Sequence, residues 1–556
     1  KMRNKSIYPL ISDIGQWYMV VVKVNNHIIE FRDSLKLLPF SVDVIGKGFK
    51  TKHRKLSIEY TGERHAHGFI SGAEKEYIKN DVLVVKEALE QLFAENHTEL
   101  TIGSCCIKEF KSICRNTADT SNPLALDTVQ YKDVFPDLFE IKIDADLYGS
   151  ENADEYIRKS YRGGWCYVVK GIENKVITRH GCTADVNSLY SSRMHSESGC
   201  VYPFGYPSFF TSEIPDKIKD NKEYYYFVRF RCRFKIKDGF LPFIQIKNSF
   251  LYQHNEYLET SDYFVDGKYY RYLNKNGEKV DSIREYTMTC TDFKMLFKHY
   301  DVYDFEILDG CYFRAYCGFF DSYINKYAEI KQQSKGAKRI IAKLFLNNLC
   351  GKFATSKNSS YQVPIMVDNV VKYFTVPEQD KKSGYIAVGS AITSYAREFT
   401  INHAQANFHG PDNPGFKYSD TDSIHCDCLP DDLQDIDVHP TNFNCWKIEN
   451  EWNQAIFVRQ KTYIEHTIKE DFEDVKPYYL IKCAGMNQKC KELLNASLTQ
   501  DYSKLDLKSL SETQKEFIHT KRTLSDFKQG LEIEGKLLPK KINGGIVLTE
   551  TTFKMR

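Results

Sequence analysis

The sequence predicts an α+β protein that is divided into several domains. The chain has 556 residues, more than one hydrophobic core usually organises. Residues 222–236 carry apolar side chains at the period of a strand, whereas residues 73–95 carry them at the spacing of a helix. Acidic residues around 185 and 420 end predicted strands and flank a lysine-bearing helix. We therefore expect distant parts of the chain to form one site.

Local patterns predict the elements of the first half of the chain. Residues 16–31 should form two strands joined by a turn at Asn25–Asn26. Residues 73–95 combine helical spacing with strong helix formers. Polar residues and proline interrupt the periodicity at 115–130, where we expect a boundary. Residues 222–236 alternate aromatic or apolar with basic residues, which predicts a long strand with one packed and one cationic face.

The second half is predicted in the same way. Residues 262–320 are rich in Tyr and Asp and should be irregular, apart from a helix near 291–300. A continuous helical pattern runs from about 320 to 350. Residues 355–388 are polar and strand-like, which indicates an insertion. Residues 487–556 are rich in Lys and Glu and should end in two short strands.

Composition limits the function only weakly. Lys and Arg number 76 and Asp and Glu number 74, so a net charge near zero neither supports nor excludes DNA binding. Aromatic residues make up 14% of the chain, enough for large cores and for stacking on bases or sugars. No apolar run approaches the ~18 residues of a membrane span. We expect a soluble intracellular protein.

The 16 cysteines are scattered through the chain. Neither a disulfide framework nor zinc fits well, because no secretory signal precedes them and no paired CxxC spacing occurs. Buried or surface thiols are expected instead. The chain starts at Lys1, in what already resembles strand sequence, so we expect a fragment or a processed product.

Two acidic strings carry the chemistry of the expected site. Asp185 lies in ADVNSLYSS, and Asp420 and Asp422 lie in YSDTDSI. Side chains at i and i+2 of a strand share a face, and in a hairpin turn both can reach one site. Carboxylates and a backbone carbonyl, here that of Val186, are hard ligands for Mg²⁺. A DxD string alone also caps turns or holds the metal of a sugar-nucleotide transferase, so its meaning depends on the other motifs.

A cationic helix lies between the acidic strings in the sequence. The continuous helical pattern places Lys331, Arg339 and Lys343 near one face. A row of cations suits a triphosphate, whose charge develops further during transfer. A solvated basic face is the alternative, but the helix runs into LNNLCGKF, where Asn347 and Gly351 indicate close contact with a base pair.

Two weaker motifs suit a nucleic-acid backbone. Lys461 and Tyr463 share one face of a predicted strand, and with Arg459 they supply charge and a hydroxyl donor for phosphates. YRGG at 161–164 should lie in a loop or tight turn, because paired glycines tolerate close backbone approach.

Together these strings resemble the motifs of family B DNA polymerases. ADVNSLYSS, LNNLCGKF, YSDTDSIH and KTY are similar to the A, B, C and KxY motifs of that family. The chain is similar in particular to the protein-primed, strand-displacing replicases of small tailed phages. This likeness covers nearly the whole chain, because DSLKLLPF, YIKND, YRGG, IQIKNS, QKTYI and KCAGM also look like that subgroup.

The resemblance implies a role for each motif residue. Implied catalytic and metal-binding residues are Asp185, Val186, Asp420 and Asp422. Implied nucleotide-binding residues are Val186, Tyr190, Lys331, Arg339, Lys343, Asn347 and Cys350, with Tyr190 excluding a ribose 2′-hydroxyl. Implied DNA-binding residues are Ser34, Phe40, Tyr161, Gly163, Gly164, Gly351, Phe353, Thr421, Arg459, Lys461 and Tyr463.

The resemblance also implies a right-hand polymerase fold with palm, fingers and thumb, two terminal-protein-type insertions and a partial RNase H-like exonuclease domain. The implied boundaries are 1–120 for the partial 3′–5′ exonuclease domain, 121–261 and 389–486 for the palm, 262–320 for the insertion that grips a terminal protein, 321–354 for the fingers, 355–388 for the insertion that gives processivity and strand displacement, and 487–556 for the thumb.

The chain departs from the family pattern at three places. Motif B usually has Tyr where this chain has Cys350, which removes an aromatic platform near the incoming base. Ser191 stands where the family usually has Pro after SLY. The exonuclease strings DxE and NxxFD are missing, and only Tyr77 and Asp81 of YIKND match the third exonuclease motif. One acid and one tyrosine cannot hold two metals, so we do not expect this chain to proofread.

The expected function is DNA-templated DNA synthesis by two-metal nucleotidyl transfer, with Mg²⁺ or Mn²⁺ as cofactor. Expected partners are primer–template DNA, deoxynucleoside triphosphates and a terminal protein as primer. The enzyme would be a monomer that copies a viral genome in the host cytoplasm, or a linear plasmid. Two alternatives are a catalytically weak scaffold that binds DNA and a terminal protein, and a DxD sugar-nucleotide transferase. The first leaves the intact acids unexplained, and the second leaves the cationic helix and KTY unexplained.

Overall fold

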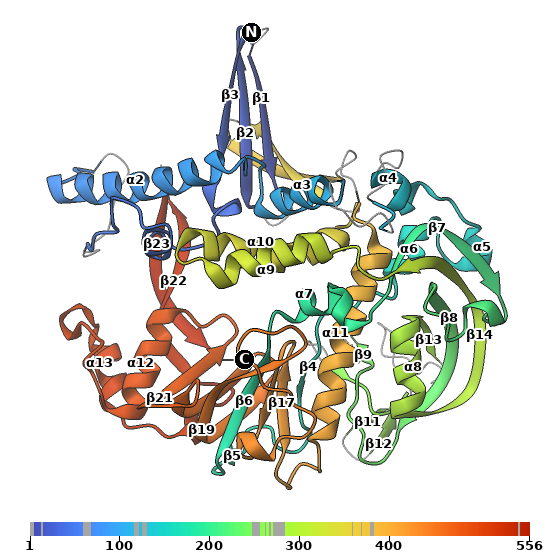
Figure 1. Cartoon of the computed structure of the whole chain (residues 1–556). Helices are drawn as coiled ribbons and strands as arrows, with labels where there is room; N and C mark the ends of the chain where they lie inside the picture. The colour runs from blue at the N-terminus through green and yellow to red at the C-terminus, as the bar shows by residue number, and fades with distance from the viewer. Residues whose placement is uncertain are drawn as a thin grey trace.

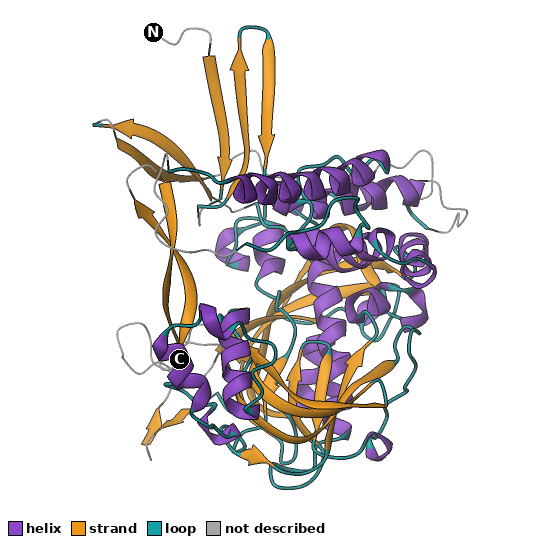
Figure 2. Cartoon of the chain, turned by 90° about the vertical axis from the view of Figure 1, so that its left-hand side faces the viewer, coloured by secondary structure: helices purple, strands orange, loops and turns teal. Residues whose placement is uncertain are grey.

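A large antiparallel sheet occupies the lower centre of Figure 1, and a layer of helices crosses above it. Figure 2 shows a small three-stranded sheet projecting beyond the helices, at the end opposite the large sheet. This computed structural model describes residues 5–12, 15–58, 68–115, 122–124, 131–246, 256–261, 263–265, 268–270, 284–357, 360–368, 370–377, 383–542 and 545–555.

The large sheet, here called the palm sheet, combines strands from distant parts of the chain. Its order is β21-β20-β19-β6-β18-β17-β4, and β5 pairs with β19. The strands are β4 (Cys166–Val168), β5 (Val176–Ile177), β6 (Gly181–Val186), β17 (Phe416–Asp420), β18 (Ser423–Cys426), β19 (Trp446–Arg459), β20 (Thr462–Glu470) and β21 (Glu473–Cys483). Because β6 is inserted between β18 and β19, an early segment of the chain is held by two late ones.

A long buried helix supports one face of the palm sheet. Helix α11 (Ile386–Ala406) is hydrophobic on most sides, as is typical of a helix buried all round. Its Ile401 and Ala404 share a core with Trp446 and Trp452 of β19. Helix α7 (Leu189–Met194) follows β6 and contacts α11. The sheet is therefore fixed from behind, which leaves its opposite face for a cleft.

The predicted strand at 222–236 is confirmed and belongs to a four-stranded sheet of order β13-β8-β14-β7, at the right of Figure 1. The helix predicted near 291–300 is confirmed. Around this helix, the prediction that 262–320 is irregular is wrong for residues 284–320, because two segments with alternating apolar residues pair with β8. The predicted boundary at 262 falls within this unit. Its main elements are β7 (Tyr202–Thr211), β8 (Tyr224–Ile236), β13 (Arg284–Thr289), α8 (Cys290–His299) and β14 (Tyr300–Tyr316), with short strands β9 (Gln245–Ile246), β10 (Glu256–Tyr257), β11 (Tyr263–Val265) and β12 (Lys268–Tyr270).

The expected cationic face of β8 is largely neutralised by its neighbours. Arg229 bonds Asp309, and Arg231 lies 3.1 Å from Glu306, both acids being on β14. The alternation of apolar and basic residues is therefore real, but its charge is mostly used within the sheet. This stripe is not a free basic surface for nucleic acid.

The helix predicted from 320 to 350 is in fact two helices, α9 (Asp321–Gln333) and α10 (Ala337–Phe353), which pack against each other. Gly336 forms the turn with φ +65°, and a Cβ there would lie 2.6 Å from the carbonyl oxygen of Gly48. Only glycine fits such a position without strain. Helical periodicity on both sides concealed the break, so the prediction of one continuous helix is wrong.

The N-terminal part confirms the predicted hairpin and helix. Asn25 has φ +53° in the turn between two antiparallel strands. The helix predicted at 73–95 begins with a capping box at Ser71 and Glu74. The described elements before residue 160 are β1 (Lys5–Ile11), β2 (Trp17–Val24), β3 (His27–Arg32), α1 (Val42–Gly48), α2 (Gly72–Ala94), α3 (Ile102–Arg115), α4 (Tyr131–Val134), α5 (Ala145–Tyr148) and α6 (Ala153–Arg158). Most of the boundary predicted at 115–130 lies outside the described residues.

The strand-like character predicted for 355–388 is confirmed by a hairpin of β15 (Ser360–Val367) and β16 (Val370–Pro377). The predicted end of this segment at 388 lies within α11, which begins at Ile386. The C-terminal part contains α12 (Gln488–Thr499), α13 (Glu512–His519), β22 (Glu532–Ile542) and β23 (Gly545–Lys554). The last two strands pair as predicted, but they are long rather than short.

The described cysteines are free thiols, most of them buried, in agreement with the sequence-based expectation. Within the described ranges, no helix combines the length and the apolar character that crossing a membrane requires.

Candidate active site

Strand register brings the two acidic strings together. Asp185, on β6, is the cross-strand partner of Ser423 on β18, the residue that follows Asp422. The amide of Val186 donates to the carbonyl oxygen of Asp422 at 2.7 Å. Asp185, Asp420 and Asp422 line one cleft of about 840 Å³. The predicted association of these acids is thus present, although they lie more than two hundred residues apart in the sequence.

A tight turn at Thr421 separates Asp420 from Asp422 and sets the positions of both acids. Thr421 has φ +68°, an uncommon conformation for a residue that is not glycine. It is held because its amide donates to the Trp165 carbonyl at 2.7 Å and its own carbonyl accepts from Thr400 at 3.0 Å. A Cβ on Gly164 would lie 2.4 Å from the Thr421 side chain. The glycine of YRGG therefore lets the loop at 161–164, confirmed as a loop, approach the turn closely.

The acids in this cleft are in an environment of excess negative charge. Burial, together with the charges of Asp422 and Glu449, raises the pKa of Asp185 to about 8 against the opposing effect of Lys343 and Lys447. Burial also raises the pKa of Asp422. Paired carboxylates that share a site resist ionising together unless a cation accompanies them. Their shifted pKa values therefore indicate a place for positive charge.

The donor set fits a hard divalent cation. Two carboxylates, those of Asp185 and Asp422, face a cleft with oxygen-rich walls, which suits Mg²⁺ or Mn²⁺ better than softer metals. Among the residues that the structure describes, no cluster of three or more His, Cys, Asp or Glu side chains is arranged to hold an ion.

The predicted cationic side chains do lie near the acids, but they come from two helices instead of one continuous helix. Lys331 is on α9, and its Nζ donates to Ser188 Oγ at 2.9 Å, just beyond β6. Arg339, on α10, donates to the Lys331 carbonyl at 2.7 Å. Lys343, also on α10, is close enough to lower the pKa of Asp185. Helix packing thus unites cations that we expected on one continuous helical face.

Helix α10 presents a stripe of exposed residues four apart: Arg339, Lys343, Asn347 and Gly351. Phe353 behaves differently, since it is 1% exposed and its ring contacts Phe110 and Phe320. The DNA-binding role of Phe353 stays a prediction, and its side chain belongs to the core. The apolar spacing that buries this residue is the same pattern that makes α10 amphipathic.

Cys350 lies at the edge of the stripe, partly buried and near both Tyr161 and Tyr190. Its Sγ donates to the Asn347 carbonyl at 3.6 Å, and burial raises its pKa to about 11. It is therefore a neutral thiol. Tyr190 packs against both large cores with part of its ring exposed. Cys350 thus lies near both tyrosines, and Tyr190 in turn is near enough to Asp422 for their charges to interact.

The KTY motif reaches the cleft from β20. Lys461 forms an ion pair with Asp420, and its amide donates to the Tyr418 hydroxyl at 2.9 Å. Tyr463 is largely buried and lines the cleft. Arg459, at the end of β19, is partly buried outside the residues that line this cleft. The structure therefore brings Lys461 and Tyr463, but not Arg459, to the acids.

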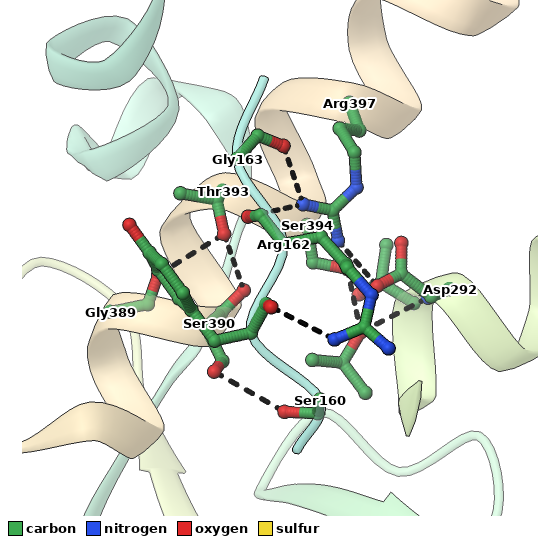
Figure 3. A network of polar contacts seen from close by, with 12 residues as sticks. Ser160, Arg162, Gly163, Asp292, Gly389, Ser390, Thr393, Ser394 and Arg397 are labelled. Atoms are coloured by element: carbon green, nitrogen blue, oxygen red, sulfur yellow. Dashed lines mark hydrogen bonds and ion pairs between the residues drawn. The ribbon is translucent and has the colours of Figure 1, made fainter. Parts of the chain in front are cut away.

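One arginine that the sequence analysis missed organises this region (Figure 3). Arg397 of α11 is 4% exposed and donates through Nη1 to the carbonyls of Arg162 and Gly163, at 2.7 and 2.9 Å. Its Nη2 lies 2.5 Å from Asp292 of α8. No short-range signal marks this residue, because its three partners lie in two other parts of the chain.

The remaining predicted residues lie elsewhere. Ser34 and Phe40 are in the N-terminal part, where Phe40 packs against the larger core. Tyr77 and Asp81 lie on α2, and Lys55 Nζ donates to both, at 2.7 and 3.1 Å. Lys55, Tyr77 and Asp81 form a second cluster, separate from the cleft at the palm sheet.

The fold and the cleft define a metal-dependent nucleotidyl-transfer enzyme. Residues 63–439 match the family described as DNA polymerase type B, organellar and viral. This match spans more than half of the chain, so the chain belongs to that family and is a DNA-directed DNA polymerase, dependent on metal ions as the family generally is. The predicted activity is confirmed, and the sugar-nucleotide transferase and scaffold alternatives are not favoured.

Named relatives agree with this assignment. The DNA polymerase of Bacillus phage phi29 is 32% identical over 568 residues, which cover 98% of this chain and 84% of that protein. The DNA polymerase of Streptococcus phage Cp-1 is 28% identical over 549 residues, 98% of this chain and 82% of that protein. The solved phi29 polymerase complex with primer–template DNA and incoming nucleotides has a TM-score of 0.76 at 32% identity, covering 99% of this chain and 85% of that one. The predicted right-hand polymerase fold is thus confirmed.

Replacing Arg397 by Met should destabilise the protein. The change leaves Asp292 buried without its partner, which typically costs about 3–5 kcal/mol. Urea unfolding of Arg397→Met and of the double variant Arg397→Met/Asp292→Asn measures this. The double variant should regain part of the loss, because the stranded charge is gone. A double variant no more stable than the single one would contradict the pairing.

Proposed function

We propose that this polymerase initiates on a protein primer and replicates a viral or linear plasmid genome with strand displacement. One observation supports the catalytic assignment: the pairing of β6 with β18 places Asp185 beside Asp422. Lys331 and Lys343 lie near these two acids. In this proposal Tyr190 and Cys350 border the sugar and base, and Asn347 contacts the nascent pair. The phage origin of the relatives supports action inside a host cell. In this proposal the enzyme works as a monomer.

Magnesium, or manganese, is the proposed ion. Bound metal would lower the barrier by stabilising the charge that develops on the attacking and leaving oxygens. Asp185 and Asp422 would hold it with the Val186 carbonyl, and Asp420 would act through its ion pair with Lys461. The carboxylates orient the site, and Lys331 and Lys343 would neutralise the triphosphate.

The primer end is proposed to lie along the edge of the palm sheet. Lys461 and Tyr463 border the acids, and Thr421 projects from the turn between them. The YRGG loop, fixed by Arg397, would carry the DNA strand past the turn through Tyr161, Gly163 and Gly164. Gly351 and Arg459 are proposed to meet the DNA backbone further from the chemistry.

Two further units have proposed roles in processive synthesis. Residues 262–320, which contribute β13, α8 and β14 to the four-stranded unit, would grip a terminal protein. The β15–β16 hairpin would enclose DNA and separate its strands, and its exposed Val370, Tyr373 and Phe374 side chains support such a role. Exposed aromatic and apolar side chains can stack on bases or wedge between them.

The N-terminal part is proposed to be a portion of a 3′–5′ exonuclease unit. Its three-stranded sheet exposes Ile7, Tyr8 and Ile28, each at least 60% accessible, and these side chains are divided between its two faces. Tyr77 and Asp81 would belong to its active region, and Ser34 and Phe40 would guide single-stranded DNA. A single acid with a tyrosine does not bind two metals, so proofreading by this chain is not proposed.

Changing Asp422 to Asn should abolish nucleotide addition while leaving DNA binding intact. Losing one ligand that stabilises transition-state charge by about 4 kcal/mol slows transfer about 10³-fold. Primer extension with Mg²⁺ and four deoxynucleotides, beside a band-shift assay, measures both effects. The exposed Asp431→Asn variant is the matched control and should extend primers normally. Retained synthesis by Asp422→Asn would remove the metal-site assignment.

Restoring an aromatic residue at position 350 should tighten nucleotide binding. Stacking on a base contributes about 1 kcal/mol or more, so Cys350→Tyr should lower the KM for nucleotide roughly fivefold. Steady-state extension at varied nucleotide concentration measures this, with Cys350→Ser as the control for loss of the thiol. Equal KM values in all three proteins would show that the position tolerates either residue.

Replacing residues 360–377 by a short Gly/Ser linker should shorten the products made in one binding event. The catalytic acids are unchanged, so addition of one nucleotide to a short primer should persist and serves as the internal control. Extension on primed circular DNA with a DNA trap measures processivity, and a downstream strand measures displacement. Full-length products from the hairpin-deleted protein would contradict the proposed role.

A further inference from the structure

A buried polar cluster lies in the palm sheet directly beside the catalytic cleft. At its centre is Glu465 of β20, which has no exposed surface. Its Oε1 accepts from His425 Nδ1 at 2.6 Å and from Thr183 Oγ1 at 3.1 Å. Its Oε2 accepts from Asn450 at 3.3 Å. The second ring nitrogen of His425 bonds the Ser423 hydroxyl at 3.2 Å.

The cluster crosses four strands of the palm sheet: β6, β18, β19 and β20. Thr183 of β6 is the cross-strand partner both of His425 on β18 and of Asn450 on β19, so these three residues form a row across the sheet. Glu465 joins this row from β20. Each strand that it touches also carries a residue of the cleft or its immediate neighbour. The cluster therefore fixes these strands relative to one another through side chains, in addition to the backbone ladder.

Both ends of the cluster reach residues that the reaction uses. Thr183 lies two residues before Asp185, and Ser423 directly follows Asp422. On the other side, the His425 ring lies edge-on to Tyr463, with centroids 4.9 Å apart. Tyr463 is two residues before Glu465 on β20. A shift of His425 would therefore be felt both at the acids and at the proposed primer-binding tyrosine.

We propose that Glu465 and His425 are positioning residues for nucleotide transfer, which hold the catalytic acids and Tyr463 in a fixed relative arrangement. The proposal rests on the assignment of Asp185 and Asp422 as catalytic acids. Within the described residues both carboxylate oxygens of Glu465 and both ring nitrogens of His425 are hydrogen-bonded, whereas Asn450 Oδ1 has no partner. Such buried hydrogen bonds restrict motion, and small displacements of reacting groups slow a reaction strongly. A group that only stabilises the sheet would affect folding without altering the transfer step.

The first test compares Glu465→Gln with a matched buried carboxylate away from the cleft. Asp309 is 1% exposed and pairs with Arg229 in the four-stranded unit, so Asp309→Asn controls for loss of a buried charge. Single-turnover addition, nucleotide KM, DNA affinity and urea unfolding are measured for both. Glu465→Gln should slow transfer about 10- to 100-fold with KM and DNA affinity unchanged. Asp309→Asn should lower stability only.

The second test removes the pair while keeping the sheet packed. Replacing both partners of a buried hydrogen-bonded pair by apolar residues of similar shape is often nearly neutral for stability. The double variant Glu465→Met/His425→Leu should therefore fold, yet remain as slow as Glu465→Gln, because Thr183 and Ser423 lose their fixed partners. Transfer at the normal rate in this stable variant would overturn the proposal. Equal slowing by Asp309→Asn would overturn it as well.

Failure of this proposal is distinguishable from failure of the catalytic assignment. If Asp422→Asn remains active, the acids are misassigned and the cluster has no site to position. If Asp422→Asn is inactive while the variants of Glu465 and His425 transfer nucleotides at the normal rate, only the positioning role is excluded.

Discussion

The insertion of β6 between β18 and β19 is the constraint on which the rest of the molecule depends. It places Asp185 beside the turn that carries Asp422 and creates a cleft in which both acids have raised pKa values. Every other part of the site is arranged around this register. The supporting helix α11, the YRGG loop and the KTY strand each contact one of the strands that it joins or the turn between them.

The site combines cations on long, flexible side chains with acids that are held on rigid, paired strands. Its cations come from α9 and α10, two helices joined at Gly336, and their long side chains can follow a substrate. The acids sit instead on paired strands braced by buried contacts, including the Arg397 network and the Glu465–His425 pair. Such a division suits an enzyme that must bind and release a nucleotide repeatedly while keeping its metal ligands fixed.

Much of the fold was predictable where the signal is local. The hairpin around Asn25, the helix at 73–95 and the long strand at 222–236 are encoded by turn residues and by periodicity over a few turns or strand residues. Residues 284–289 and 300–316 were misjudged because their strands are defined by pairing with β8 rather than by their own composition. The break at Gly336 was hidden because helical spacing continues on both of its sides.

The sequence by itself determined the chemistry: three acids, a set of lysines and a KTY motif whose residue types permit metal-dependent transfer, in an order that resembles one polymerase family. Tertiary structure alone decided how these residues meet. It moved Phe353 into the core, brought Lys331 to Ser188 from a separate helix and revealed Arg397 and Glu465 as organising residues. The physical reason is that burial and strand register depend on contacts between residues hundreds of positions apart, which no local pattern records.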